Sequence, residues 1–151
     1  MSDRLRVVID TNVLVSGAIA PWGSSAFIMR LFKQEAFVVI ISEQLLNELY
    51  RVLGRRRIRN RYHVTERQRK KIVGRLALIG EFVEPIGGVQ ICRDLTDDYL
   101  IEMAILGQAT HLVTGDKDFH DDPVLLRFLQ EHGVTAIRPA DFAALLREQT
   151  I

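Results

Sequence analysis

The chain has 151 residues, a net charge of +1, 48% hydrophobic residues and 26% charged residues, which is an ordinary soluble composition. This length suits one domain that spans residues 1–151. A single cysteine, Cys92, excludes an internal disulfide and a cysteine-rich zinc site, and it fits a reducing, cytoplasmic setting. No segment reaches the roughly 18 consecutive apolar residues of a membrane span, so we expect no membrane association.

The predicted elements alternate between strands and helices along the chain. Short apolar strands are predicted at 6–9, 37–41, 82–86, 111–113 and 134–138. Helices are predicted directly after the first strand and at 24–34, 43–53, 66–80, 95–109, 123–133 and 139–149, with a short basic helix within 55–63. Most strands are too apolar to face water, which indicates a mainly parallel sheet with helices on both sides. We therefore expect an α/β fold, a three-layer α/β/α sandwich.

Polar residues mark the starts of several predicted helices. Ser24 or Ser25 is the expected N-cap of the second helix, and Ser42 and Thr96 are expected at two later ones. Thr65 and Gln68 have the spacing of a capping box. Pro85 restricts its strand to an edge of the sheet.

The near-neutral total charge hides two segments of opposite sign. Residues 51–71 contain ten Lys and Arg against one acid, Glu66. Residues 92–122 contain eight Asp and Glu against two basic residues, Arg93 and Lys117. This division suggests an anionic partner and a separate cation site.

Two aspartates follow predicted strands directly. Asp10 interrupts the apolar stretch "RVVIDTNVLVSG", where an unpaired charge is expensive unless it has a partner or a use. Asp116 comes just after the strand "HLV". Because sites in open parallel sheets form beyond the carboxyl ends of the strands, both carboxylates are expected at one edge of the sheet.

Two further acids lie on helices that follow strands. At about 100° per residue, Glu48 falls at the border of the apolar stripe of its helix, whereas Glu43 points to solvent. On the helix that starts near residue 97, Asp97 falls on the buried stripe, Asp98 on its flank, and Glu102 points outward. Taken singly, Asp97 could be a helix cap, Asp116 a turn residue and Glu48 a solvated acid.

Together, Asp10, Glu48, Asp97 and Asp116 form a cluster that would repel itself without a cation. Hard divalent cations such as Mg²⁺ and Mn²⁺ prefer oxygen ligands, and Mg²⁺ also binds substrate phosphates. The chemistry that suits this set is metal-assisted hydrolysis of a phosphodiester bond.

The arginine-rich segment after the Glu48 helix is either a solvated surface or a strip that contacts a nucleic-acid backbone through Arg55, Arg56, Arg57, Arg59 and Arg61. Trp22 and Tyr62 could stack on unpaired bases, but we expect both to be packed in the protein. The four histidines are scattered and receive no role.

The motifs "VVIDTNVLVSG", "SEQLLNELYRVL", "DLTDDYLIEMAILGQATHLVTGDKDF" and "IRPADF" strongly resemble those of the PIN-domain family of ribonucleases. More narrowly, the chain is similar to bacterial and archaeal PIN proteins grouped with VapC-type toxins. The resemblance covers nearly the whole chain. It implies Mg²⁺- or Mn²⁺-dependent endonuclease cleavage of single-stranded RNA, a cytoplasmic homodimer, and an antitoxin protein as a partner.

By position, the acids of the family's catalytic site correspond to Asp10, Glu48, Asp97 and Asp116, with Asp10, Asp97 and Asp116 as metal ligands. Asp98 would replace Asp97 if the alignment slipped by one, but the helical wheel and the family spacing both favour Asp97. The supporting polar residues correspond to Thr11, Asn12 and Thr114.

Two alternatives remain open at this point. A non-catalytic RNA-binding module would use the basic strip and leave the acids unused. A haloacid-dehalogenase-like phosphatase would use Asp10 as its nucleophile, but such enzymes need a second acid two residues later, where this chain has Asn12.

Overall fold

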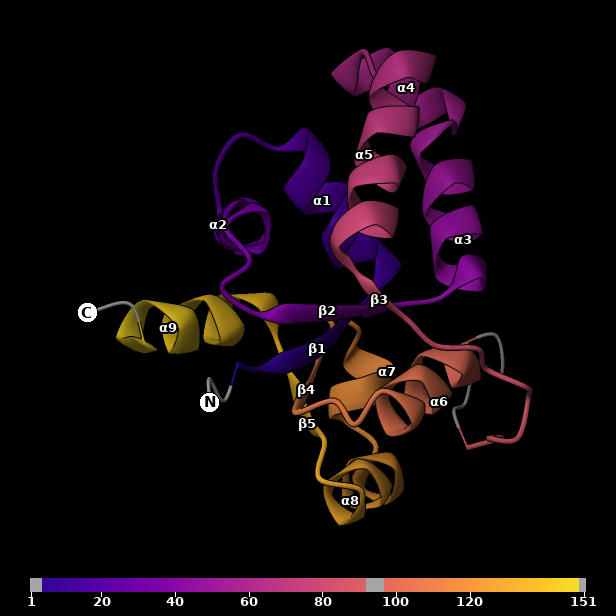
Figure 1. Cartoon of the computed structure of the whole chain (residues 1–151), viewed down its shortest axis with the longest axis vertical. Coiled ribbons are helices and arrows are strands. Elements are labelled where there is room, and N and C mark those ends of the chain that lie inside the picture. Colours follow the sequence, from indigo (N-terminus) through magenta and orange to yellow (C-terminus); the bar gives the residue numbers. More distant parts are fainter. Residues whose placement is uncertain (1–3, 92–96, 150–151) are drawn as a thin grey trace.

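A five-stranded sheet forms the centre of the molecule in the computed structural model, which describes residues 4–91 and 97–149. Its strands are β1 (Arg6–Ile9), β2 (Val38–Ile41), β3 (Glu81–Phe82), β4 (His111–Val113) and β5 (Thr135–Ile137). They are ordered β3-β2-β1-β4-β5, and each neighbouring pair is parallel. Figure 1 shows helices on both faces of this sheet. The predicted α/β/α sandwich is confirmed.

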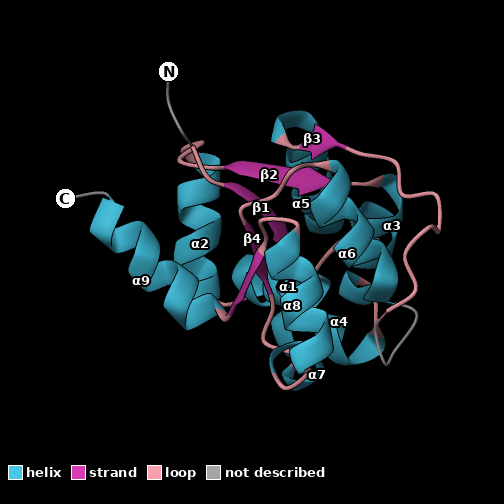
Figure 2. Ribbon diagram, turned by 90° about the horizontal axis from the view of Figure 1, so that it is seen from below, coloured by secondary structure: helices cyan, strands magenta, loops and turns pink. Residues whose placement is uncertain are grey.

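Apart from α7, the helices within the described ranges are close to those predicted from the sequence. They are α1 (Thr11–Ile19), α2 (Ser24–Lys33), α3 (Glu43–Leu53), α4 (Arg56–Tyr62), α5 (Glu66–Ile79), α6 (Asp98–Leu106), α7 (Lys117–His120), α8 (Pro123–Glu131) and α9 (Pro139–Gln149). Helices α1, α2, α3 and α5 lie on one side of the sheet, and α6, α7 and α8 lie on the other (Figure 1). Helix α9 packs beside α2 (Figure 2).

The central strands are buried on both faces, as their continuous apolar sequences predict. Val7, Val8 and Ile9 of β1 are fully buried. At one flank, the ring of Phe142 from α9 meets Phe37 edge to face, with centroids 5.5 Å apart. Burial of this kind fixes the strands in the protein interior, so that their carboxyl ends present the residues that follow them at defined positions.

Local signals explain most helix ends, with a few differences. Ser42 accepts a hydrogen bond from the backbone N–H of Leu45, and Thr65 and Gln68 form the predicted capping box. Helix α2, however, is capped by Gly23, with φ of 99°, and not by Ser24 or Ser25. Glycine adopts this left-handed conformation without strain, so the chain turns one residue earlier than predicted. The predicted cap Thr96 lies outside the described residues.

Glu102 differs from its prediction as well. It was expected to point outward from its helix, but it is buried, with 5% exposure. Its carboxylate accepts hydrogen bonds from the backbone N–H groups of Ile86, Gly87 and Gly88. The connection between β3 and α6 therefore covers the helix face that the wheel assigned to solvent.

Helices α1 and α2 cross at close range next to Gly17. A Cβ atom at this position would lie 2.3 Å from Cγ of Met29 and 2.6 Å from the carbonyl oxygen of Ser25. Contacts this short do not occur between real side chains, so the crossing requires glycine.

Within the described part of the chain, no single helix is long and apolar enough to cross a membrane. Helices α1 and α2 have the length and apolar composition of a membrane span only when taken together, and the chain bends by 87° between them.

Candidate metal and catalytic site

The order in which the chain adds strands to the sheet reverses between β1 and β4. From β1 the chain adds β2 and β3 on one side, and it then crosses to place β4 on the other side of β1. Ile9 at the end of β1 is paired with Val113 at the end of β4. In open α/β sheets this switch point leaves a crevice beyond the carboxyl ends of the strands, where ligands bind. Asp10 and Thr114 are the residues that enter it.

Asp10 is half-buried at the start of α1. Its backbone N–H donates to the carbonyl of Val113 at 2.9 Å, and its Oδ2 accepts from the hydroxyl of Thr114 at 2.8 Å. Burial raises the pKa of this carboxyl. The Thr114 hydroxyl and the N–H of Asn12 act in the opposite direction, and the charges of Glu48 and Asp116 raise the pKa further. Asp10 therefore lies in the field of two other carboxylates.

Asp116 faces the same pocket as Asp10. Its backbone N–H donates to Oγ1 of Thr114 at 3.1 Å, so one threonine hydroxyl links both aspartates. Its Oδ1 accepts from the N–H of Asp118 at 2.9 Å, which starts the short helix α7 that the sequence did not predict. The pocket has a volume of about 440 Å³ and is lined by Asp10, Asn12, Val13, Ser25, Gly115 and Asp116. Two carboxylates and no basic side chain thus line one opening.

Glu48 lies on α3, which is on the same side of the sheet as α1, and its charge acts on Asp10. Its carboxylate accepts a hydrogen bond from the hydroxyl of Tyr99 on α6. Tyr99 is 8% exposed, and its pKa is raised by burial and by the bond to Glu48, so the hydroxyl stays protonated as a donor. Tyr99 fixes the orientation of Glu48. Sequence reasoning missed it, although a hydroxyl group in the first turn of an apolar helix was a usable signal.

Asp97 and Asp98 have different surroundings. Asp98 is 6% exposed, and its Oδ1 accepts from the backbone N–H of Ile91 at 3.0 Å. Asp97 is the N-cap residue of α6, but its side chain makes no capping hydrogen bond to the helix. Neither Asp97 nor Asp98 is among the described residues that line the pocket of Asp10 and Asp116.

Thr11 lies at the back of this region. It is 3% exposed, and its Oγ1 has no hydrogen-bond partner among the described residues. The hydroxyl is close enough to Tyr99 to lower the pKa of the phenol, but it does not reach hydrogen-bond geometry. A buried hydroxyl of this kind can still bond to a ligand or to solvent.

A divalent cation fits this donor set by charge and by ligand type. Asp10 and Asp116 supply carboxylate oxygens to one pocket, Glu48 adds a third negative charge, and the three charges disfavour one another without a counter-ion. No group of three or more Asp, Glu, His or Cys side chains in residues 4–91 and 97–149 is already arranged at metal-ligand spacing. Asp10 and Asp116 are therefore the pair on which a site would be built.

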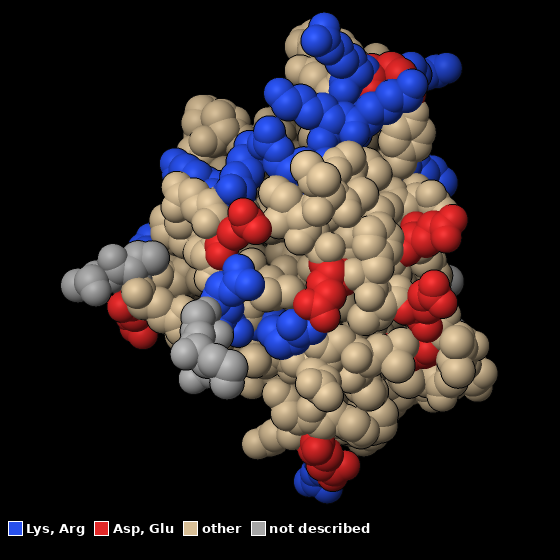
Figure 3. Space-filling view, in the orientation of Figure 1, with Lys and Arg blue, Asp and Glu red and all other residues tan. Residues whose placement is uncertain are grey.

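The predicted RNA strip lies away from this pocket. Arg55 precedes α4, and the other four arginines of the strip are on it. Basic side chains gather over this end of the molecule (Figure 3). Trp22 is 79% exposed and Tyr62 41% exposed, so the expectation that both are packed is wrong. The guanidinium of Arg61 lies 5.5 Å from the centroid of the Tyr62 ring.

Comparison with known proteins agrees with the fold. A family model of the PIN domain matches residues 6–118. An uncharacterized protein of Methanocaldococcus jannaschii is 31% identical over 116 residues, which cover 76% of this chain and 73% of the relative. Residues 6–118, which the family model matches, contain β1 to β4 and all four predicted site acids. PIN domains have a nuclease-type fold, and they typically use divalent metal ions. The chain belongs to the PIN-domain family.

Proposed function

We propose that this protein is a Mg²⁺- or Mn²⁺-dependent endoribonuclease that hydrolyses phosphodiester bonds in single-stranded RNA. The observation that carries the proposal is the shared pocket of Asp10 and Asp116 at the switch point of the sheet, within the field of Glu48. A cluster of like charges beside an open pocket destabilises the folded protein. Such a cluster is typical of a site that binds a cation together with a phosphate group.

Each residue of the candidate site has a separate role in the proposed reaction. Asp10 and Asp116, with Asp97, would hold one or two divalent ions, which when bound neutralise phosphate charge and make a water molecule more acidic. Thr114 holds both aspartates in place through its hydroxyl. Glu48, oriented by Tyr99, would accept a proton from the attacking water. Asn12 lines the pocket and can donate to a phosphate oxygen.

The test is a cleavage assay on a labelled single-stranded RNA, with double-stranded RNA and single-stranded DNA in parallel. We expect cleavage of the single strand with Mg²⁺ or Mn²⁺ and no cleavage in EDTA. Asp10→Asn should abolish the activity, whereas Asp121→Asn, which removes an exposed acid outside the pocket, should retain it. Equal cleavage by wild type and Asp10→Asn would identify a contaminating nuclease and would contradict the proposal.

The second candidate is a non-catalytic RNA-binding PIN domain. It is favoured by the lack of a ready three-ligand group in residues 4–91 and 97–149 and by the exposed basic surface on α4. It predicts RNA binding that is the same with EDTA and with Mg²⁺, and no cleavage under either condition. The assay above separates the two candidates.

The resemblance also leads us to propose a homodimer and an antitoxin partner. Exposed apolar side chains near the edge strand β3, including Phe82 at 52% and Ile86 at 89%, support self-association. Light scattering on the purified protein tests the dimer. A protein encoded beside this one should co-purify with it and suppress cleavage if it is an antitoxin.

A further inference from the structure

A second cavity lies between α2 and α5, on the side of the sheet that is covered by α1. It has a volume of about 320 Å³ and is closed at one end by the last turn of α1. Its size is at the lower end of the range for small-molecule sites. The basic cavity, as we call it, is lined by Lys33 from α2 and by Lys71 and Arg75 from α5, around Met29, Phe32 and Ile72.

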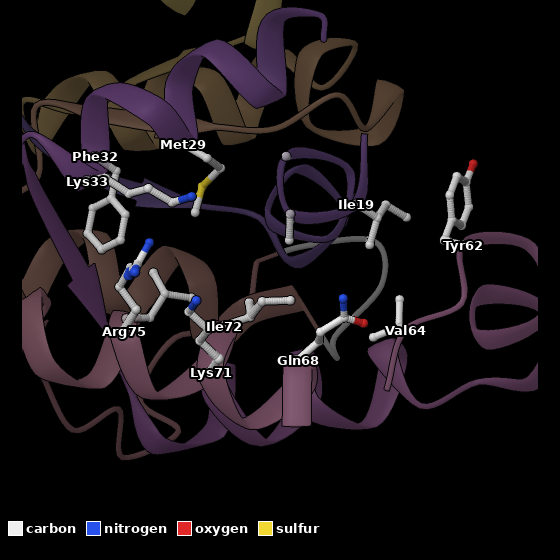
Figure 4. A pocket seen from close by; sticks show the side chains of 13 residues that line it. Ile19, Met29, Phe32, Lys33, Tyr62, Val64, Gln68, Lys71, Ile72 and Arg75 are labelled. Atoms are coloured by element: carbon white, nitrogen blue, oxygen red, sulfur yellow. The ribbon is translucent and has the colours of Figure 1, made fainter. Parts of the chain in front are cut away.

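The three cationic groups lie at one end of the basic cavity. Figure 4 shows Lys33 reaching across from α2, with Arg75 and Lys71 opposite it on α5. No acid lines the cavity, and none of the three side chains makes an ion pair in the described structure. The neighbouring Arg69 and Lys70, by contrast, both pair with Glu66. The positive charge in the cavity is therefore not neutralised by an ion pair in the described structure. The positive charge of Arg69 and Lys70 beside the cavity is neutralised by Glu66.

The remaining wall of the basic cavity is apolar and aromatic. Phe32 and Leu76 are each 1% exposed and form its floor. Tyr62 lies at the end opposite the cations, with its ring free of the core (Figure 4). A ligand that fits this cavity carries concentrated negative charge at one end and a flat apolar group at the other.

We propose that the basic cavity binds the phosphate of a nucleotide, with the base lying against the apolar wall toward Tyr62. Lys33, Lys71 and Arg75 supply charge-assisted donors for phosphate oxygens, and an aromatic ring can stack on any base. The nucleotide comes either from solution, as a free monophosphate, or from a single-stranded RNA.

The position of the cavity relative to Asp10 favours RNA. Helix α1 begins next to Asp10, and its last residues, Gly17, Ala18 and Ile19, line the basic cavity. At 1.5 Å per residue, the eight residues from Asp10 to Ala18 span about 12 Å. A single-stranded RNA bound at Asp10 and Asp116 can thus reach the basic cavity with a nucleotide a few positions away. This choice of source rests on the proposed ribonuclease function, whereas the cavity's preference for a nucleotide phosphate does not.

The experiment measures binding without cleavage. A short fluorescent single-stranded RNA is titrated with the protein in EDTA at several salt concentrations. A variant carrying Lys33→Gln, Lys71→Gln and Arg75→Gln should bind more weakly, and its plot of log affinity against log salt should be shallower by about 2, since each lost contact removes about 0.7. Unlabelled adenosine monophosphate is titrated separately by calorimetry.

The matched control carries Arg30→Gln, Arg67→Gln and Arg127→Gln, which remove the same charge from exposed positions outside the cavity. We expect its salt slope to stay near that of the wild type. An equal fall in both triple variants, or no fall in either, would overturn the proposal. Circular dichroism and thermal melting verify that both variants are folded.

The other arms identify the source of the ligand. Monophosphate binding that is lost in the cavity variant supports a site for free nucleotides, and binding of RNA alone supports an RNA subsite. Cavity-dependent binding of an acidic peptide, with neither nucleotide nor RNA bound, would overturn the proposal in favour of a protein partner. Because all arms omit divalent metal, their outcome is independent of whether Asp10 supports cleavage.

Discussion

The acidic pocket and the basic cavity lie along the same helix, α1, and are opposite in charge. The acidic pocket presents Asp10 and Asp116 with no basic side chain, and the basic cavity presents Lys33, Lys71 and Arg75 with no acid. At some other places on the described surface, opposite charges pair within the protein, as Arg6 does with Glu81 at 2.6 Å. The two cavities are places where the fold leaves charge to be neutralised from outside.

The two cavities also differ in how rigidly their charges are held. Asp10 is half-buried and bonded to Thr114, and Glu48 is bonded to Tyr99. Lys33 and Lys71 have exposed side chains, and neither makes an ion pair with another described residue. Fixed carboxylates suit a reaction that demands geometry, whereas mobile cations suit the capture of a flexible polyanion. We therefore expect changes in the acidic pocket to affect the rate and changes in the basic cavity to affect binding.

After the loss of activity expected for Asp10→Asn, the largest effect is expected for Asp116→Asn. Loss of one carboxylate from the pocket removes a metal ligand, and several kcal/mol of transition-state stabilisation corresponds to a fall in cleavage rate of at least about 100-fold. Single-turnover cleavage of RNA measures it, with Asp121→Asn as the control. A loss of less than tenfold would remove Asp116 from the set of metal ligands.

A smaller effect is expected for Tyr99→Phe, which deletes only the hydroxyl that orients Glu48. Positioning groups of this kind typically contribute about 10- to 100-fold. The loss should appear in the rate constant at saturating RNA, and RNA binding in EDTA should be unchanged. If Tyr99→Phe weakened binding instead, the division between the two cavities would be wrong.

The basic-cavity variant should have the opposite signature. Neutralising Lys33, Lys71 and Arg75 should raise KM by roughly tenfold, because exposed contacts each contribute modestly, and should leave kcat unchanged. Steady-state kinetics on the same RNA provide the measurement. A fall in kcat with constant KM would place these side chains in the chemical step and contradict our assignment.

The smallest effect concerns stability. Because the pKa of Asp10 is raised in the folded protein, mainly by burial, its contribution to stability is full below the unfolded value near 3.9 and is lost as the pH rises through the folded pKa. In EDTA, Asp10→Asn should therefore melt at a slightly higher temperature than wild type at neutral pH, and this advantage should shrink as the pH falls toward 4. Adding Mg²⁺ should stabilise the wild type and not the variant. An advantage for wild type in EDTA at neutral pH would contradict this assignment.

The fold, and the prediction of two of the candidate site acids, followed from local sequence patterns. Asp10 stood out because it interrupts an apolar strand, and Glu48 because its helix has one apolar face and one polar face. The same wheel gave the wrong result for Glu102, because α6 is buried on nearly all sides and has no free polar face. Its covering segment, residues 86–88, lies on a distant part of the sequence, so no local periodicity reports it.

The basic cavity could not be predicted from the sequence for a related reason. Lys33 lies on α2, and Lys71 and Arg75 lie nearly forty residues later on α5. In the sequence, each of these three residues has the position of an ordinary charged residue on the polar side of a helix. Only the packing of α2 and α5 around the end of α1 brings them to one opening. Tyr99 was missed in the same way, because its partner Glu48 is 51 residues away.

Gly17 joins the two cavities physically. It packs against Ser25, which lines the acidic pocket, and against Met29, which lines the basic cavity. Any side chain at this position would push α2 away from α1 and distort both openings at once. A saturation mutagenesis screen for activity should therefore rank Gly17 among the least tolerant positions, although it bears no group that could take part in chemistry. Low tolerance to mutation at Gly17 would then reflect the close crossing of α1 and α2 and would not mark Gly17 as an active-site residue.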